Sequence, residues 1–221
     1  MRWARCRWGG RRRGVLRTGG VAPGVLRVRG SSVRPHMDDL RPGHYWKTPF
    51  VWEEGCPEQT SVSRLRFEVA EYDWLKGAVA QTMASSMDES DMFAVSRGGP
   101  SKAATDLIAM APEYFDLQPG WWRLAKDTEE NQVGFVLPVL FKGEKTRKEG
   151  RPEATIFYMG VLPEYRGLGY GRELLDEAVR TCRLADCWRL FCDTGTENHP
   201  MVNAFRSAGF KERNPWQRPV A

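Results

Sequence analysis

The sequence Val161-Leu-Pro-Glu-Tyr-Arg-Gly-Leu-Gly-Tyr-Gly171 joins two regular elements that the pattern of apolar residues predicts. Residues 155–162 are strongly apolar, which is typical of a buried strand. Residues 169–183 carry apolar side chains at helical spacing. The stretch between them is therefore predicted to be a turn from the end of a buried strand into the first turn of a helix.

This turn carries three alternate glycines, Gly167, Gly169 and Gly171. Glycine lets the backbone approach an anion closely and adopt positive φ angles. The N–H groups at the start of the following helix add partial positive charge. The turn therefore suits a pyrophosphate, although the same pattern is also typical of a tight strand–helix connection.

The glycine spacing differs from two common phosphate-binding motifs. The dinucleotide fingerprint G-x-G-x-x-G needs glycine at the position of Arg172. The P-loop needs G-K-[ST], which does not occur in this stretch. We therefore expect neither a Rossmann-type nor a P-loop cofactor site.

What the stretch does resemble is the acyl-CoA signature of the GNAT acetyltransferase superfamily. The family pattern V-x-P-x-[YF]-[QR]-x-x-G-x-[GA] is met by Val161, Pro163, Tyr165, Arg166, Gly169 and Gly171. A second family feature is an Asn after the next strand, followed by an aromatic residue and Gly-Phe. It appears here as Asn198, Phe205 and Gly209-Phe210. The resemblance covers the chain from about residue 63 onward and implies the family fold.

The resemblance also implies acetyl-CoA as cosubstrate. Backbone groups of the strand end would pair with the pantetheine arm like an added strand, provided that this strand splays from its neighbour. Amides at the helix start would hold the pyrophosphate, and Asn198 would bond to the pantetheine or to the splayed strand. The implied coenzyme contacts are Met159, Gly160, Val161, Arg166, Gly167, Leu168, Gly169, Tyr170, Gly171, Arg172 and Asn198.

The expected reaction is direct attack of a primary amine on the thioester, with loss of a proton from the amine. In members that act on protein N-termini, a Glu precedes the Asn by five positions, where this chain has Asp193. Asp193 is therefore the expected general base, with a strand-end turn residue as the alternative. The chain departs from many members at Phe205, where a Tyr would protonate the leaving thiolate. Tyr158 and Tyr165 are the alternative donors.

Two other functions stay open on the sequence. A non-catalytic acyl-CoA-binding sensor is favoured by Phe205 and by the uncertain base. A nucleic-acid-associated protein would use the Arg-rich first residues. The acceptor is a small-molecule or protein amine, and the acidic domain favours a cationic one.

The fold class expected is a mixed α/β one, with a mostly antiparallel GNAT-like sheet flanked by helices in the order β-α-α-β-β-β-α-β-α-β. Residues 1–36 are Arg- and Gly-rich and are expected to be disordered. Residues 37–62 are expected to form an irregular aromatic arm. Residues 63–221 are expected to form the acetyltransferase domain.

The formal charge of +5 arises from the first 36 residues. Without their ten arginines, 23 basic residues face 28 acidic ones, a net charge of −5 for 37–221, so nucleic-acid binding by the domain is not expected. Three interpretations of residues 1–36 remain: an upstream extension with a true start at Met37, an organelle transit peptide, and a nucleic-acid-binding arm.

Scattered cysteines without a paired spacing indicate a reduced intracellular protein, so we expect a cytoplasmic location, with organelle targeting as the alternative. The cysteines and the three histidines lack zinc-type spacing, so no metal site is expected. No apolar run is long enough to predict a membrane span. A homodimer is left open.

Overall fold

The computed structural model describes residues 40–55, 63–143 and 147–220. Within these ranges nine strands form one sheet in the order β2-β4-β5-β6-β7-β1-β8, with β3 paired to β5 and β9 paired to β1. The strands are β1 His44–Glu53, β2 Arg66–Val69, β3 Phe115–Asp116, β4 Arg123–Lys126, β5 Gln132–Phe141, β6 Glu153–Val161, β7 Arg189–Gly195, β8 Lys211–Glu212 and β9 Trp216–Pro219. The helices are α1 Tyr72–Ala84, α2 Glu89–Ser96, α3 Gly99–Tyr114, α4 Tyr170–Leu184 and α5 His199–Ser207.

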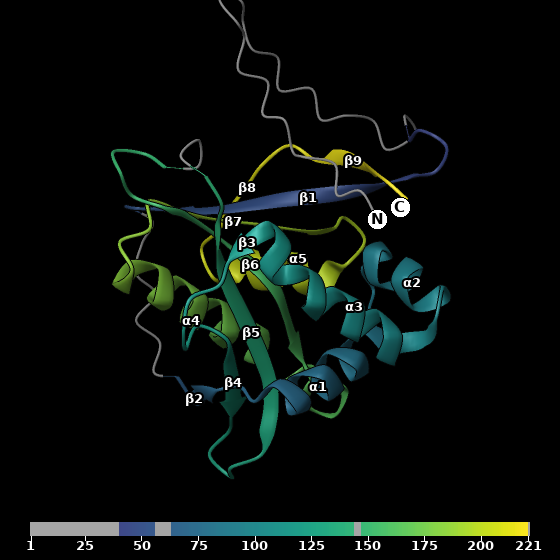
Figure 1. The fold of residues 1–221 in the computed structure, drawn as a ribbon, viewed down its shortest axis with the longest axis horizontal. Coiled ribbons are helices and arrows are strands. Elements are labelled where there is room, and N and C mark those ends of the chain that lie inside the picture. The colour runs from purple at the N-terminus through teal and green to yellow at the C-terminus, as the bar shows by residue number, and fades with distance from the viewer. Residues whose placement is uncertain (1–39, 56–62, 144–146, 221) are drawn as a thin grey trace, which may run out of the picture.

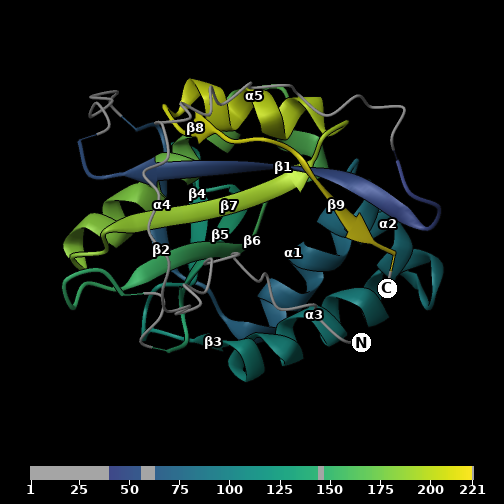
Figure 2. The same cartoon turned by 90° about the horizontal axis from the view of Figure 1, so that it is seen from above.

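Helices cover both faces of this sheet (Figures 1 and 2). Strand β5 shows why, because its successive side chains point to opposite faces. Phe135 and Leu137 pack with α1 and α3, whereas Val136 packs in the cluster that includes α4 and α5. All pairings except that of β6 with β7 are antiparallel, so the expected mixed α/β, mostly antiparallel fold is confirmed. None of the helices in the described ranges is long and apolar enough to cross a bilayer.

Strands β6 and β7 pair for only part of their lengths. Their parallel register joins Glu153–Thr155 to Arg189–Phe191. Beyond it, β6 continues to Val161 and β7 continues to Gly195 without further pairing between the two. In Figure 1, β6 runs down the view while β7 runs across it. The expected splay between these strands is therefore present, and one edge of β6 faces a wedge over residues 156–161.

The expected irregular arm is wrong for residues 44–53, which form β1, a ten-residue strand inside the sheet. β1 pairs with β7 on one edge and with β8 and β9 on the other. Pro49 argued against a strand, since proline cannot donate to the ladder. The carbonyl of Pro49 faces the β8 side, where it accepts from the N–H of Arg213 at 2.9 Å. β8 and β9 leave a gap in their register opposite 48–49, so the missing N–H of Pro49 deprives neither strand of a partner.

The helical part of the chain also differs from the expected order. α2 was not predicted, although Asp88 before Met92-Phe93-Ala94-Val95 is typical of a helix start. The side chain of Asp88 caps α2 by accepting from the N–H of Ser90 at 3.0 Å. α3 begins at Gly99, and Pro100 lies in its first turn, where proline is favoured. The single strand expected after the last helix is divided into β8 and β9.

Candidate functional site

The turn between β6 and α4 presents a row of free amides. None of the backbone N–H groups of residues 167–171 finds a hydrogen-bond acceptor among the described residues. Gly167 has φ +80°, and a Cβ built on it would meet no atom within 4 Å. Gly169 has φ +86° at the N-cap of α4, a conformation that other residues rarely adopt. The turn therefore exposes unpaired donors at the positive end of a helix, as an anion site requires.

Arg64, which precedes β2, holds this turn from outside the motif. Its guanidinium donates to the carbonyl oxygen of Leu168 at 2.9 Å and to Glu173 Oε1 at 2.5 and 2.8 Å. Its backbone N–H donates to Glu173 Oε2 at 2.7 Å. The guanidinium also lies 4.9 Å from the ring centre of Tyr170. The sequence carries no local signal for this role of Arg64, because its contact with Leu168 spans 104 residues.

The two arginines expected at the coenzyme point elsewhere with their side chains. Arg166 donates to the carbonyl oxygens of Ser85, Thr82 and Val161 at 2.9, 3.3 and 3.2 Å, so it joins the end of α1 to the end of β6. Arg172 lies 3.7 Å from Asp176 one turn further along α4. Their backbone N–H groups are also bonded, that of Arg166 to the carbonyl of Pro163 at 3.4 Å and that of Arg172 to the carbonyl of Gly169 at 3.2 Å. The structure therefore does not direct either arginine to a phosphate, and the free donors of the turn are the N–H groups between them.

Met159, Gly160 and Val161 lie on β6 where the wedge opens. On one edge they are paired with Val136, Phe135 and Gly134 of β5. The other edge faces the wedge, because the pairing of β6 with β7 ends at Thr155. An exposed strand edge beside the free amides of the turn can accept an extended ligand by strand addition.

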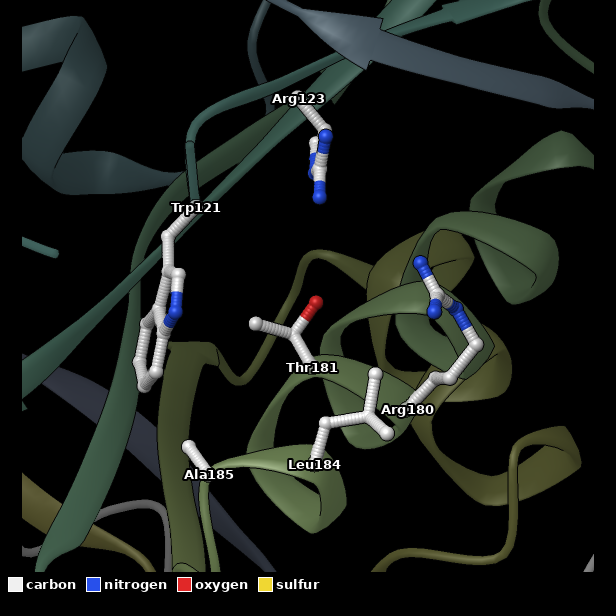
Figure 3. A pocket seen from close by; sticks show the side chains of 6 residues that line it. All are labelled: Trp121, Arg123, Arg180, Thr181, Leu184 and Ala185. Atoms are coloured by element: carbon white, nitrogen blue, oxygen red, sulfur yellow. The ribbon is translucent and has the colours of Figure 1, made fainter. Parts of the chain in front are cut away.

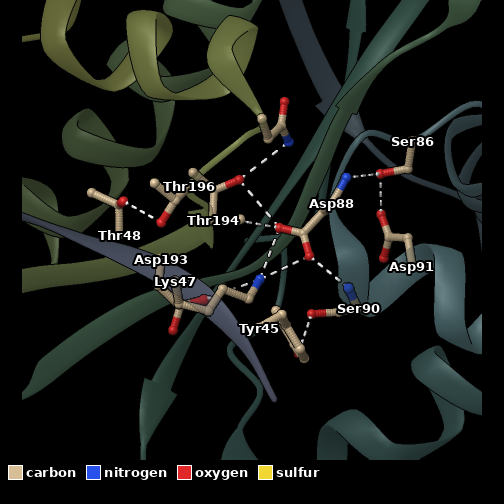
Figure 4. A network of polar contacts seen from close by, with 12 residues as sticks. Tyr45, Lys47, Thr48, Ser86, Asp88, Ser90, Asp91, Asp193, Thr194 and Thr196 are labelled. Atoms are coloured by element: carbon tan, nitrogen blue, oxygen red, sulfur yellow. Dashed lines mark hydrogen bonds and ion pairs between the residues drawn. The ribbon is translucent and has the colours of Figure 1, made fainter. Parts of the chain in front are cut away.

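A buried polar network joins β1, β7 and α2 at the far side of the wedge (Figure 4). Lys47 Nζ donates to both carboxylate oxygens of Asp88 at 2.9 and 2.8 Å. Asp88 Oδ2 also accepts from the N–H of Gly195 at 2.7 Å and from the hydroxyl of Thr194 at 3.2 Å. Asn198 donates to the same hydroxyl oxygen at 3.2 Å, so its side chain is placed on the splayed strand.

The charges of this network shift the pKa values of its members. Burial opposes the ionised form of Asp88, but the ammonium of Lys47 outweighs it and lowers the pKa of Asp88 to about 2. Burial alone would lower the pKa of Lys47, whereas the carboxylates of Asp193 and Asp88 raise it above the usual value. Lys47 is therefore a fixed cation between two carboxylates.

Asp193, the expected base, is one of those two carboxylates. Its Oδ1 lies 3.5 Å from Lys47 Nζ, and its side chain is 20% exposed. Asp193 lies beyond the part of β7 that pairs with β6, and it stands opposite Pro49 of β1. The carboxylate of Glu153 accepts from Arg189 Nε at 2.8 Å, where β6 and β7 are paired. Glu153 is thus held away from the wedge.

A second carboxylate, Asp91 of α2, meets β6 through Tyr158. The hydroxyl of Tyr158 donates to Asp91 Oδ2 at 2.7 Å, and the hydroxyl of Ser86 donates to the same oxygen at 2.6 Å. Burial raises the pKa of Asp91 to about 6, and the nearby charge of Asp88 acts in the same direction. Burial, together with Asp91, raises the pKa of Tyr158 well above the usual value.

Phe205 belongs to the core rather than to a reactive site. It is buried, it stacks on Phe50 of β1 with ring centres 4.6 Å apart, and it meets Phe210 edge-on at 5.2 Å. At the position where many family members carry the proton donor, this chain thus has a core side chain.

Two hollows lie away from the wedge. One, of about 150 Å³, is lined by Trp121, Arg123, Arg180, Thr181, Leu184 and Ala185 beside the C-terminal part of α4 (Figure 3). The other, of about 340 Å³, is lined by residues of the β2 end and of the segment 117–122. Neither hollow includes a residue expected to bind coenzyme. We place the site at the wedge because the free amides and the open strand edge are there.

Comparison with known proteins identifies the family. A model of the acetyltransferase (GNAT) family matches residues 88–210, more than half of the chain. The chain belongs to the GNAT family of acetyltransferases. The matched range of this GNAT domain contains the free amides, the strand edge, Asp91, Asp193 and Asn198.

Relatives of this GNAT domain are distant. A mycothiol acetyltransferase of Saccharomonospora viridis is 26% identical over 202 residues, which covers 80% of this chain and 62% of that protein. The chain therefore spans less than two thirds of that relative's length. The structure of a GNAT acetyltransferase from Colwellia psychrerythraea has a TM-score of 0.50 at 13% identity, covering 79% of this chain and 54% of that one. A functionally unknown protein from Staphylococcus epidermidis has a TM-score of 0.51 at 14% identity, covering 79% and 60%. These structures share the fold.

Proposed function

We propose that this GNAT domain transfers an acetyl group from acetyl-CoA to a primary amine by direct attack of the amine on the thioester. The observation that carries the proposal is the row of unpaired amides at 167–171 beside the open edge of β6. A pyrophosphate on these amides would leave the edge of β6 free for the pantetheine arm, which is itself extended and rich in amide groups. The family match and the relative's name support acetyl transfer in general.

Each residue group has a defined task in this proposal. The amides of 167–171 bind the pyrophosphate, and the edge at Met159–Val161 binds the pantetheine. Acetyl-CoA supplies an acetyl group activated as a thioester. Asn198 bonds to Thr194 of β7 and so belongs to the β7 side of the wedge. A backbone N–H on the open edge of β6 would stabilise the oxyanion. The thiolate can leave without a proton donor at position 205, since a thiol pKa of roughly 8.5 makes it a tolerable leaving group.

The proposed acceptor is cationic. Residues 37–221 carry a net charge of −5. The carboxylates of Asp88 and Asp193 lie on either side of Lys47 (Figure 4). Glu89 is close enough to Asp88 and Glu197 for their charges to raise its pKa, and the charge of Lys47 opposes them. A field of this sign attracts polyamines, aminoglycosides and peptide amines before they dock.

The first test is binding and turnover with a panel of amines. Native mass spectrometry should show one acetyl-CoA bound per chain. Thiol release should then be measured with spermidine, an aminoglycoside, a lysine-containing peptide and a peptide with a free N-terminus. Binding without thiol release for every amine would favour the acyl-CoA-binding sensor, which Phe205 also favours.

A substitution in the turn at 167–171 tests whether the coenzyme binds there. Gly169→Glu should abolish acetyl-CoA binding, because it puts a side chain and a negative charge where the phosphates are expected. Gly150→Glu is the matched control, since Gly150 also has a positive φ of +82° and open space for a Cβ but lies in the β5–β6 connection. Calorimetry should show wild-type affinity for the control. Undiminished affinity in folded Gly169→Glu protein would remove the site from this turn.

A further inference from the structure

A hydroxyl–carboxylate pair crosses from β6 to α2 beside the wedge. Tyr158 stands on β6 immediately before the proposed pantetheine contacts, and its hydroxyl donates to Asp91 Oδ2 at 2.7 Å. Asp91 is buried, with 7% of its surface exposed, so an amine in the wedge cannot reach it directly. Tyr158 is half-buried and reaches between the two regions.

We propose that Tyr158 and Asp91 form a relay that takes the proton from the acceptor amine, with Tyr158 as the contact and Asp91 as the final acceptor. The inference rests on the proposed function, because it needs an amine that arrives as an ammonium ion. It gives this pair the task of the general base, for which the sequence suggested Asp193.

The surroundings of Asp91 suit a base that works near neutral pH. Its carboxylate faces the hydroxyls of Ser86 and Tyr158, the carboxylate of Asp88 and, further off, the ammonium of Lys47. Burial and Asp88 raise the pKa of Asp91 to about 6 despite the two hydrogen bonds. Asp91 is therefore ionised at pH 7, yet it is a stronger base than an ordinary aspartate.

The direction of proton transfer follows from the same contacts. Burial and Asp91 raise the pKa of Tyr158 well above the usual value, and Arg166 opposes this only in part. A hydroxyl held by a carboxylate is a poor acid, so Tyr158 is unsuited to protonate a leaving thiolate. It is well placed to pass a proton on to the carboxylate that already accepts its hydrogen bond.

The ammonium gives one proton to Tyr158 Oη as the Tyr158 proton moves to Asp91 Oδ2, which leaves a neutral amine and a neutral Asp91. The amine lone pair forms the C–N bond at the thioester carbon, and the C=O electron pair moves to oxygen. When the C=O bond re-forms, the C–S bond breaks and its electron pair leaves with sulfur. The second nitrogen proton goes to the thiolate, and Asp91 returns its proton to solvent.

Asp193, proposed from the sequence, is less suited to this task. It shares the ammonium of Lys47 with Asp88, at 3.5 Å. Protonation of Asp193 would weaken that ion pair, whereas protonation of Asp91 removes a buried negative charge that lies near Asp88. Asp193→Asn is therefore expected to change turnover less than Asp91→Asn and to leave the pH profile unaltered.

The relay is tested with Tyr158→Phe and the panel amine that gives the highest turnover. At pH 7 kcat should fall about 100-fold, the lower range for general base catalysis. The acid limb of the pH–rate profile near pH 6 should disappear. The deficit should shrink as pH approaches the pKa of the acceptor, because the amine then arrives deprotonated. Calorimetric affinity for acetyl-CoA should stay at the wild-type value, which also shows that the variant is folded.

Tyr45→Phe is the matched control, because Tyr45 donates to or accepts from Ser90 of the same helix at 2.7 Å without touching Asp91. It should keep the wild-type pH profile. Asp91→Asn should lose as much turnover as Tyr158→Phe, and the double variant should lose no more than either single one.

Three outcomes overturn the relay: a wild-type pH profile in Tyr158→Phe, the same loss in Tyr45→Phe, or additive losses in the double variant. An active wild-type enzyme with any of these results overturns the relay alone. A wild-type chain that binds acetyl-CoA but acetylates no amine overturns the proposed function, and the relay with it.

Discussion

Asp88 and Asp91 lie three positions apart at the start of α2, and their environments move their pKa values in opposite directions. Lys47 overcomes the burial of Asp88 and lowers its pKa to about 2. Asp91 forms no ion pair with a cation among the described residues, and burial raises its pKa to about 6. Two carboxylates whose surroundings separate their pKa values in this way commonly have different tasks in a site. Here Asp88 is structural, and Asp91 is proposed to be chemical.

The raised pKa of Asp91 predicts an effect on stability. The folded chain holds the Asp91 proton more tightly than the unfolded chain, so the stability due to this group is complete below about pH 4 and is lost as pH rises through about 6. Asp91→Asn removes the buried charge. We expect it to raise the free energy of unfolding at pH 8 by roughly 2 kcal/mol, or about 5 °C in Tm. Near pH 4 the gain should vanish.

Thermal unfolding of both proteins from pH 4 to pH 8 checks this prediction. A gain that does not depend on pH would show that the substitution acts through packing instead of charge. A more stable but slower Asp91→Asn enzyme would agree with the relay, since functional groups are often held at a cost in stability.

At the scale of elements, α4 begins at a turn that another segment holds. Arg64 reaches the carbonyl of Leu168 and the buried carboxylate of Glu173, although it belongs to the approach to β2. These contacts fix the turn with its N–H groups unpaired. Without these contacts the backbone of the turn would have to become ordered when a ligand binds, and that cost would lower the affinity for the ligand.

Arg64→Ala is therefore expected to weaken the binding of CoA about 10-fold, because the turn is no longer held in its binding conformation. The affinity of Arg64→Lys for CoA should lie between those of wild type and Arg64→Ala, since lysine keeps the charge but lacks the planar guanidinium that serves two acceptors. Arg66→Ala is the control, because Arg66 pairs with Glu68 and Glu130 away from the turn. Calorimetry should also show equal binding of acetyl-pantetheine, which has no pyrophosphate, to Arg64→Ala and wild type. A loss with both ligands would contradict a role at the phosphates.

At the scale of the molecule, β1 holds together the strands at one end of the sheet. It pairs with β7, β8 and β9, and it brings the fully buried Phe50 against Phe205 of α5. The wedge depends on this arrangement, because β7 is held by β1 where it no longer pairs with β6.

Phe50→Ala should thus destabilise the whole domain, since it removes a large side chain from the core and leaves a cavity. We expect a loss of about 3–5 kcal/mol in the free energy of unfolding, measured in urea. Val69→Ala, at an exposed strand end, should change it by less than about 0.5 kcal/mol. A small loss in the free energy of unfolding of Phe50→Ala would mean that β1 covers the core but contributes little to its stability.

Local sequence was enough to predict the glycine-rich turn into α4 and most of the elements around it. The turn at 161–171 is contiguous, and its chemistry belongs to the backbone, so glycine spacing and a helix start suffice to indicate it. Most strands and helices from Arg66 onward were also predictable, because each has its own apolar periodicity. The family resemblance added the fold and the need for a splayed strand.

Tertiary structure alone decided which distant residues meet. The Tyr158–Asp91 contact spans 67 residues and the Arg64–Leu168 contact spans 104. β1 was missed because Pro49 and its dense aromatic residues obscured a strand that is stable only between β7 and β9. Such contacts depend on strand register and on where two strands part, which residue spacing along the chain does not encode.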